Sequence, residues 1–316
     1  MVGMMRKSKW IAGTSAEMPL SDAARLAVAA RLGVVWEYLS EDGAETRQDV
    51  ENVHQMRVWS RRAVAALDIF WDLLPQRRAR WFKKQLKRLR RAAGDARDYD
   101  VLAARLDGRA KAAGGRTLTA AIERVRASRN EAQGPIDDVC HRLRGKEFDR
   151  RAERLISRMR YIDAQPEPTF GQAAHDGLRR PIGRFFEAAA EDLSDIAALH
   201  RFRIAGKQLR YTMELFAGAF PPAFREKLYC EVEALQEKLG QINDYATAIA
   251  RFERWRDEAA GVDESQQLGK LATAEKSRLA KARRTFFTWW TKDRCASMRR
   301  QFTRLTAAPS AEKASV

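Results

Sequence analysis

A row of cations in the second half of the chain has the spacing needed to bind a polyanion. His200, Arg203, Lys207 and Arg210 recur at intervals of 3, 4 and 3 residues, which places them on one face of a helix. The row spans about 15 Å at a rise of about 1.5 Å per residue. Cations in a line suit a chain of phosphates, because each side chain can meet a separate phosphate. No Asp or Glu lies between His200 and Arg210, so we expect the row to be unneutralised.

The first half of the chain carries a similar row, formed by His54, Arg57 and Arg61. In both halves apolar residues occupy the opposite helix face. An ordinary solvated helix face would explain one such row, but the same arrangement in two places favours ligand binding. Either His54 or His200 could donate a hydrogen bond to phosphate when protonated. No HExxH or paired-histidine motif accompanies them, so we expect no metal and no cofactor.

Other cations are candidates for additional polyanion contacts. Lys84, Arg88 and Arg91 share one face of the predicted helix that follows the first cationic row. An ordinary solvated helix face explains these three residues about as well. Their counterparts in the second half are not basic. Two more pairs share helical faces near the middle and the end of the chain. The candidates are Lys84, Arg88, Arg91, Arg126, Arg129, Lys281 and Arg284.

The two rows belong to an internal repeat with a constant offset of 146 residues. Residues 54–106 align with residues 200–252 without a gap, and ten positions are identical. The identical types include His, Pro, Gly and Tyr, which coincide by chance less readily than Ala or Leu. A repeat of this length exceeds any solenoid unit, so it indicates a duplication into two related helical halves.

Apolar residues recur with helical periodicity through most of the chain. No segment shows the alternation of apolar and polar residues that is typical of a β-strand. We expect a loosely ordered N-terminal arm over 1–19, a first half over 20–161, a second half over 169–305 and a disordered tail over 306–316. A proline-containing break over 161–168 separates the halves. Gly94 and Gly240 are each expected to end one helix, with nearby aspartates capping the next or pairing with Arg97.

Composition narrows the classes of function. The 316-residue chain has a formal net charge of +17 and 45% apolar residues, so it can form a core and attract a polyanion. The longest uncharged run is ten residues, far short of a membrane span. Three widely separated cysteines fit single thiols in a reducing cytoplasm. We therefore expect a cytoplasmic protein without membrane insertion.

Four segments resemble the conserved histidine α-helical domain (CHAD) family. They read HQMRVWSRR at 54–62, GDARDYDVL at 94–102, LHRFRIAGKQLRY at 199–211 and LQEKLGQINDY at 235–245. The resemblance implies an all-α fold of two pseudo-symmetric halves, each like a four-helix bundle with extra helices, packed as one unit around a basic surface. It also implies binding of inorganic polyphosphate and association with polyphosphate granules.

By the family motif, the binding residues are His54, Arg57, Arg61, His200, Arg203, Lys207 and Arg210. The chain departs from a symmetric pattern at one place: Val64 aligns with Arg210, so the first row lacks one cation and is expected to bind more weakly. Some relatives carry a triphosphate-tunnel enzyme domain with a Glu-x-Glu-x-Lys signature. The chain shows no such motif.

We therefore expect a non-enzymatic polyphosphate-binding protein. The second interpretation is a nucleic-acid-binding protein, which the positive charge allows. The sequence shows neither a recognisable nucleic-acid-binding fold nor a set of aromatic residues on which bases could stack. The third is an enzyme that processes phosphate esters or polyphosphate, for which no Walker loop, nucleophile elbow or acidic metal cluster is found.

Overall fold

The computed structural model of the protein describes residues 7–40, 49–112, 119–163 and 165–306. It confirms the all-α fold class: the structure is 83% helical, and the described residues contain no strand. The α-helices are α1 (Leu20–Leu39), α2 (Val50–Ile69), α3 (Gln76–Ala112), α4 (Thr119–Glu131), α5 (Gly134–Gly145), α6 (Phe148–Ile156), α7 (Phe170–Ala189), α8 (Ile196–Phe216), α9 (Cys230–Glu258), α10 (Val262–Trp289) and α11 (Lys292–Thr306). Short helical turns at Trp71–Leu73, Ala217–Ala219 and Phe224–Tyr229 connect some of them.

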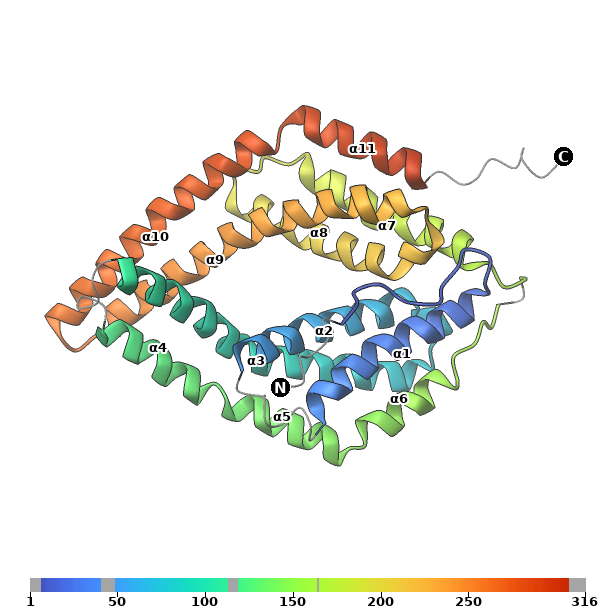
Figure 1. The fold of residues 1–316 in the computed structure, drawn as a ribbon, viewed down its shortest axis with the longest axis horizontal. Coiled ribbons are helices and arrows are strands. Elements are labelled where there is room, and N and C mark those ends of the chain that lie inside the picture. The colour runs from blue at the N-terminus through green and yellow to red at the C-terminus, as the bar shows by residue number, and fades with distance from the viewer. Residues whose placement is uncertain (1–6, 41–48, 113–118, 164, 307–316) are drawn as a thin grey trace.

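The helices form an elongated molecule with α2, α3, α8 and α9 at its centre (Figure 1). Helices α4, α5 and α6 lie along one edge, and α10 and α11 lie along the opposite edge. No helix in the described ranges is long and apolar enough to span a membrane. The helices that carry the two cationic rows, α2 and α8, are therefore central elements of the fold and not peripheral ones.

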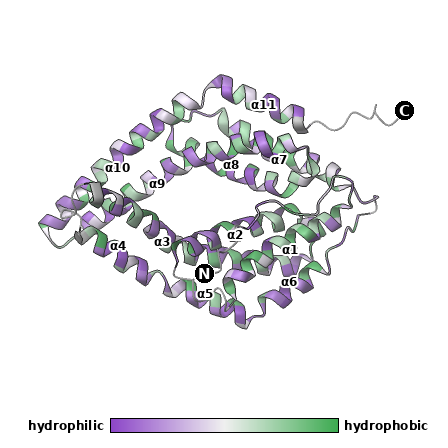
Figure 2. Ribbon diagram, viewed as in Figure 1, coloured by the Kyte–Doolittle hydropathy of each residue, from purple (hydrophilic) through white to green (hydrophobic). Residues whose placement is uncertain are grey.

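The predicted apolar faces of α2 and α8 are buried, as their periodicity requires. Trp59 and Leu67 of α2 and Phe202 and Leu209 of α8 are each at most 2% exposed. Green apolar and purple polar positions alternate along the helices in Figure 2, as expected for amphipathic helices. The cationic rows consequently project away from the main core.

Helices α3 and α9 are each continuous, so the expectation that Gly94 and Gly240 end helices is wrong. Both glycines lie inside a helix, and a Cβ atom at either position would meet nothing within 4 Å. Helix continuity here is maintained by packing on both sides of the glycine: Leu89 and Leu102 on α3, for example, are at most 4% exposed. This packing overrides the cost of a helical glycine, about 1 kcal/mol relative to alanine.

Other boundaries differ in smaller ways. Helices α5 and α6 are separated at Glu147, which has a left-handed backbone with φ 53°. Residues 290–291 separate α10 from α11. The expected break at 161–168 lies between α6 and α7.

The N-terminal arm, residues 7–19, is packed against the helices, so the expectation of a loose segment is wrong for this part. Ile11 is 5% exposed, and the Trp10 ring lies edge-on to the Tyr229 ring with centroids 4.7 Å apart. The main chain of the arm is held as well, because Gly171 N–H donates to the carbonyl oxygen of Ala16 at 2.8 Å. Residues 1–6 and the predicted tail from 307 onward lie outside the described residues.

Repeat-equivalent residues make reciprocal contacts between α3 and α9. The Arg105 guanidinium of α3 lies 4.3 Å from the ring centroid of Tyr245 on α9. Its repeat equivalent, Arg251 of α9, lies 4.6 Å from the ring centroid of Tyr99 on α3. Such exchanged pairs are typical of a two-fold interface. Superposition of the complete halves stays a prediction.

Candidate functional site: a cationic groove between α2 and α8

A groove of about 880 Å³ is lined by α2, α8, α9 and the N-terminal arm. Four of the seven predicted binding residues line it: His54, Arg61, Lys207 and Arg210. Arg57 and Arg203 lie beside these residues, as the electrostatic interactions below show. The structure thus brings six of the seven side chains into one region.

The cationic rows of α2 and α8 face each other. Burial lowers the pKa of the Arg203 guanidinium, and Arg57 of the opposite row acts in the same direction. Burial also lowers the pKa of Lys207 to about 7, assisted by the positive charges of Arg203, Arg61, Arg210 and Arg57. A bound anion would relieve this repulsion, so the groove is suited electrostatically to a ligand of high negative charge.

His54 lines the groove as an uncharged imidazole at neutral pH. Burial, followed by the positive charge of Arg97, lowers its pKa to about 4, and Arg61 and Arg57 act in the same direction. The expectation that His54 donates to phosphate in its protonated form therefore does not apply near pH 7. A neutral imidazole can still donate one N–H.

His200 is positioned differently from its repeat equivalent. It lies in the first turns of α8, is exposed, and is not among the residues that line the groove. The identical spacing of the two rows therefore does not produce two identical environments. A binding role for His200 stays a prediction.

The repeated spacing around Asp98 and Asp244 is explained by pairing with the cationic rows. The Arg57 guanidinium donates to the Asp98 carboxylate at 3.1 Å and to the Gly94 carbonyl oxygen at 2.9 Å. Burial raises the pKa of the repeat-equivalent Asp244, and the charge of Arg203 opposes this rise. The expectation that these aspartates cap helices is therefore wrong, because each lies inside a continuous helix. The expected interaction with Arg97 is seen at the nearby Asp100, where the positive charge of Arg97 opposes the rise of the carboxyl pKa caused by burial.

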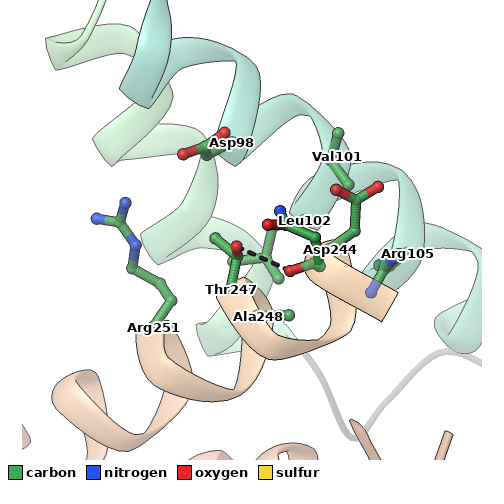
Figure 3. Close-up of a pocket in the computed structure, with 9 residues that line it drawn as sticks. Asp98, Val101, Leu102, Arg105, Asp244, Thr247, Ala248 and Arg251 are labelled. Carbon is green, nitrogen blue, oxygen red and sulfur yellow. Dashed lines mark hydrogen bonds between the residues drawn. The ribbon is translucent and has the colours of Figure 1, made fainter. Parts of the chain in front are cut away.

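A small pocket lies between these aspartates. Asp98 and Arg105 project from α3, and Asp244 and Arg251 project from α9 (Figure 3). Its volume of about 40 Å³ has space for only one or two water molecules. The larger groove is therefore the better candidate for a polymeric ligand.

A buried carboxylate holds the far end of the α8 row. Glu214 is fully buried and accepts hydrogen bonds from Arg62 at 2.7 and 3.1 Å, from Tyr229 at 2.8 Å and from Arg210 at 3.1 Å. The row is thus neutralised at Arg210, contrary to the expectation of an unneutralised row. Burial opposes the charged form of Arg210, but Glu214 outweighs it and raises the pKa of the guanidinium.

Several groups at the site are not revealed by the spacing of the cations. Glu214 stands four residues after Arg210, a position at which ion pairing could have been anticipated. Tyr211 interacts with Arg61 and opposes the lowering of its pKa by burial, and Lys7 and Lys9 of the arm line the groove. These three have no signal in the repeat, because Tyr211 aligns with Ala65 and the arm precedes the repeated segment.

The additional cation candidates lie on α3, α4 and α10 and do not line the groove. Arg129 is held by Asp100 at 2.6 Å and by Gln133 at 3.0 Å, so its charge is partnered within the fold. Arg126 lies 3.5 Å from Asp107, and Arg88 donates to Gln85 at 3.3 Å. The remaining candidates, all exposed, are Lys84, Arg91, Lys281 and Arg284. Polyanion contact by any of these side chains stays a prediction.

Comparison with known proteins identifies the family. Two solved structures share the fold: the CHAD domain from the plant Ricinus communis and PptA from Streptomyces chartreusis. The first has a TM-score of 0.67 and 22% identity, covering 90% of this chain and 97% of the other. The second has a TM-score of 0.61 and 19% identity, covering 85% of this chain and 98% of the other.

A search among curated proteins gave no significant match. The family model described as the CHAD domain matches residues 27–253. This segment contains the whole of α2 and α8 and most of α9, the helices that line the groove. The chain therefore belongs to the CHAD domain family.

Proposed function

We propose that this protein binds inorganic polyphosphate in the groove between α2 and α8. The observation that carries the proposal is the convergence of Arg57, Arg61, Arg203 and Lys207, whose mutual repulsion contributes to lowering the pKa of Lys207. Cations held this close together are stabilised when a polyanion supplies several negative charges at once. A chain of phosphates provides such charges at regular intervals.

The proposed role is binding without a chemical step, at the surface of polyphosphate granules. The groove supplies fixed positive charge and hydrogen-bond donors, which are what a binding site for a polymer of phosphates needs. Within the described residues, no cluster of His, Cys, Asp or Glu has the arrangement of a metal site. Phosphate release from polyphosphate in the presence of divalent metal would contradict this part of the proposal.

The experiment measures the affinity for sodium polyphosphate by isothermal titration, with single-stranded DNA as competitor. We expect the triple variant Arg61→Gln, Lys207→Gln, Arg203→Gln to bind at least about a hundredfold more weakly, at tenfold per 1.4 kcal/mol. Gln is a good helix former, so α2 and α8 should persist in the circular dichroism spectrum. Arg210 is left unchanged because its removal would take one of the hydrogen-bond donors from the buried Glu214 and could destabilise the fold.

A matched control removes three charges outside the groove. Lys270, Lys292 and Arg300 are exposed residues of α10 and α11. Replacing all three with Gln lowers the net charge by the same amount, and we expect the affinity to remain within about threefold of that of the unmodified protein. Equal losses in the two folded variants would show that diffuse charge is responsible. Complete displacement by DNA at equal phosphate concentration would favour a nucleic-acid-binding function instead.

A further inference from the structure

The wall that α9 contributes to the groove lacks the cations that the repeat would lead one to expect. Glu233, Gln236 and Glu237 of α9 line the groove. With the 146-residue offset, the equivalent residues of α3 are Lys87, Arg90 and Arg91. Two carboxylates and an amide therefore stand where the first half of the chain has three cations. A polyanion in the groove would be repelled along this wall if nothing compensated for the carboxylates.

The N-terminal arm brings positive charge to this wall. The Lys9 ammonium lies 2.8 Å from Oε1 of Glu233 and 4.3 Å from the centroid of the Tyr229 ring. Lys7 forms an ion pair with Glu37 and also lines the groove. The side chain of Lys9 is 29% exposed, so its ammonium can meet a ligand while it remains beside Glu233. Lys9 therefore places a positive charge beside Glu233, where the equivalent position of α3 carries Lys87.

The fold holds this part of the arm in place. The guanidinium of Arg31, which is 1% exposed, donates to the carbonyl oxygen of Lys9 at 2.6 Å. Trp10 packs edge-on against Tyr229, and the Arg225 guanidinium lies 5.4 Å from the centroid of the indole ring. Lys9 is thus presented to the groove from a fixed main chain and not from a freely moving end.

An unsatisfied amide on the same wall points to a ligand. Gln236 is 8% exposed, and neither its amide nitrogen nor its amide oxygen has a hydrogen-bond partner among the described residues. A Cβ atom at Gly206 would overlap this amide, so the glycine makes room for it. A buried amide without hydrogen-bond partners is destabilising, and a phosphate oxygen could accept from its N–H group.

We propose that the N-terminal arm forms part of the polyphosphate site, with Lys7 and Lys9 as direct ligands of phosphate on the α9 wall. This inference rests on the proposed function, because it concerns the same groove. It adds a binding element that lies outside both the repeat and the segment matched by the family model. Lys9 then serves two negative groups, Glu233 of the protein and a phosphate of the ligand.

The first test compares the double variant Lys7→Gln, Lys9→Gln with the control Lys270→Gln, Lys292→Gln. We expect the arm variant to bind sodium polyphosphate about tenfold more weakly and the control to change by less than about twofold. The salt dependence of the affinity should also become shallower in the arm variant, by about 0.7 in the logarithmic slope for each phosphate that is no longer neutralised. A decrease in affinity equal to that of the control, or an unchanged slope, would overturn the inference.

A second test separates direct contact from simple neutralisation of Glu233. If Lys9 only screens Glu233, then Lys9→Gln should have no effect in a Glu233→Gln background. If Lys9 contacts phosphate, Glu233→Gln alone should tighten binding, and Lys9→Gln should still weaken it in that background. Circular dichroism confirms folding of each variant.

The two proposals fail in different ways. Absence of polyphosphate binding by the unmodified protein would overturn both. Normal binding by the unmodified protein, together with equal affinities of the arm variant and its control, would overturn the role of the arm and leave the groove as the site.

Discussion

At the scale of single residues, Lys207 is the side chain whose charge depends most on ligand. Its pKa of about 7 means that the ammonium is only partly protonated near neutral pH. A bound polyanion would favour the charged form and raise this pKa, so binding should be accompanied by proton uptake. The pKa of His54 is about 4 without ligand, much farther below neutral pH than that of Lys207.

This coupling predicts a pH dependence with a definite sign. Affinity for polyphosphate should be highest below about pH 7 and should fall as the pH rises above 7, by up to about tenfold per pH unit. Lys207→Arg keeps the charge at all these pH values, so this variant should lose the decline. Titrations from about pH 6 to pH 9 test this, and comparing the two proteins cancels any titration of the ligand. The same decline in both proteins would exclude Lys207 as its source.

Sequence spacing predicted which cations share a helix face but not how each is partnered. The charge of Arg57 acts on Arg203 of the other helix, and both charges act on Lys207. The partner of Arg210, Glu214, follows from helical geometry, but its burial beneath Arg62 and Tyr229 depends on packing between α2, α8 and the segment before α9. Contacts between separate elements leave no periodic signal in a sequence.

At the scale of elements, α3 and α9 show how tertiary packing overrides a local signal. Glycine with a nearby aspartate is typical of the end of one helix and the start of the next, so the sequence predicted a helix end at Gly94 and another at Gly240. Each helix instead continues past its glycine, and Arg57 uses the Gly94 carbonyl as an acceptor. A continuous α3 is what places Asp98 within reach of Arg57 and Arg105 within reach of Tyr245.

Replacing Gly240 with Ala tests whether residue 240 lies in the interior of a helix or at a break between two helices. The residue lies inside α9, and an added Cβ atom would meet nothing within 4 Å. We expect Gly240→Ala to raise the free energy of unfolding by about 0.5–1 kcal/mol, because alanine has the higher helix propensity. The melting temperature should rise accordingly. A lower melting temperature would show that residue 240 adopts a conformation that only glycine tolerates.

At the scale of the whole molecule, helices from both repeated segments lie at the centre and line the candidate groove. The repeat carries one cationic row on α2 and another on α8, and reciprocal contacts between Arg105, Tyr245, Arg251 and Tyr99 hold the two segments together. The sequence therefore predicted the all-α fold and the two cationic rows, but not that the rows face each other. It did not predict the arm, because a segment outside the repeat has no equivalent to guide its placement.

Binding by the overall net charge of +17 and binding in the central groove predict different effects of mutations on the salt dependence of the affinity. If the groove binds polyphosphate, each phosphate it neutralises releases counterions, with a slope of about −0.7 per contact taken from single-stranded nucleic acid. Arg61, Arg203 and Lys207 together with the partly neutralised Arg57 and Arg210 would give a slope of about −2 to −4 for the logarithm of affinity against that of salt concentration.

Titrations of sodium polyphosphate at several salt concentrations measure this slope. The control Lys270→Gln, Lys292→Gln, Arg300→Gln should keep the slope of the unmodified protein, because these exposed cations of α10 and α11 lie outside the groove. The variant Arg61→Gln, Arg203→Gln, Lys207→Gln should lose about 2 from its magnitude. A slope near zero for the unmodified protein would contradict a charge mechanism, and equal reductions in both variants would assign binding to the overall charge and not to the facing rows.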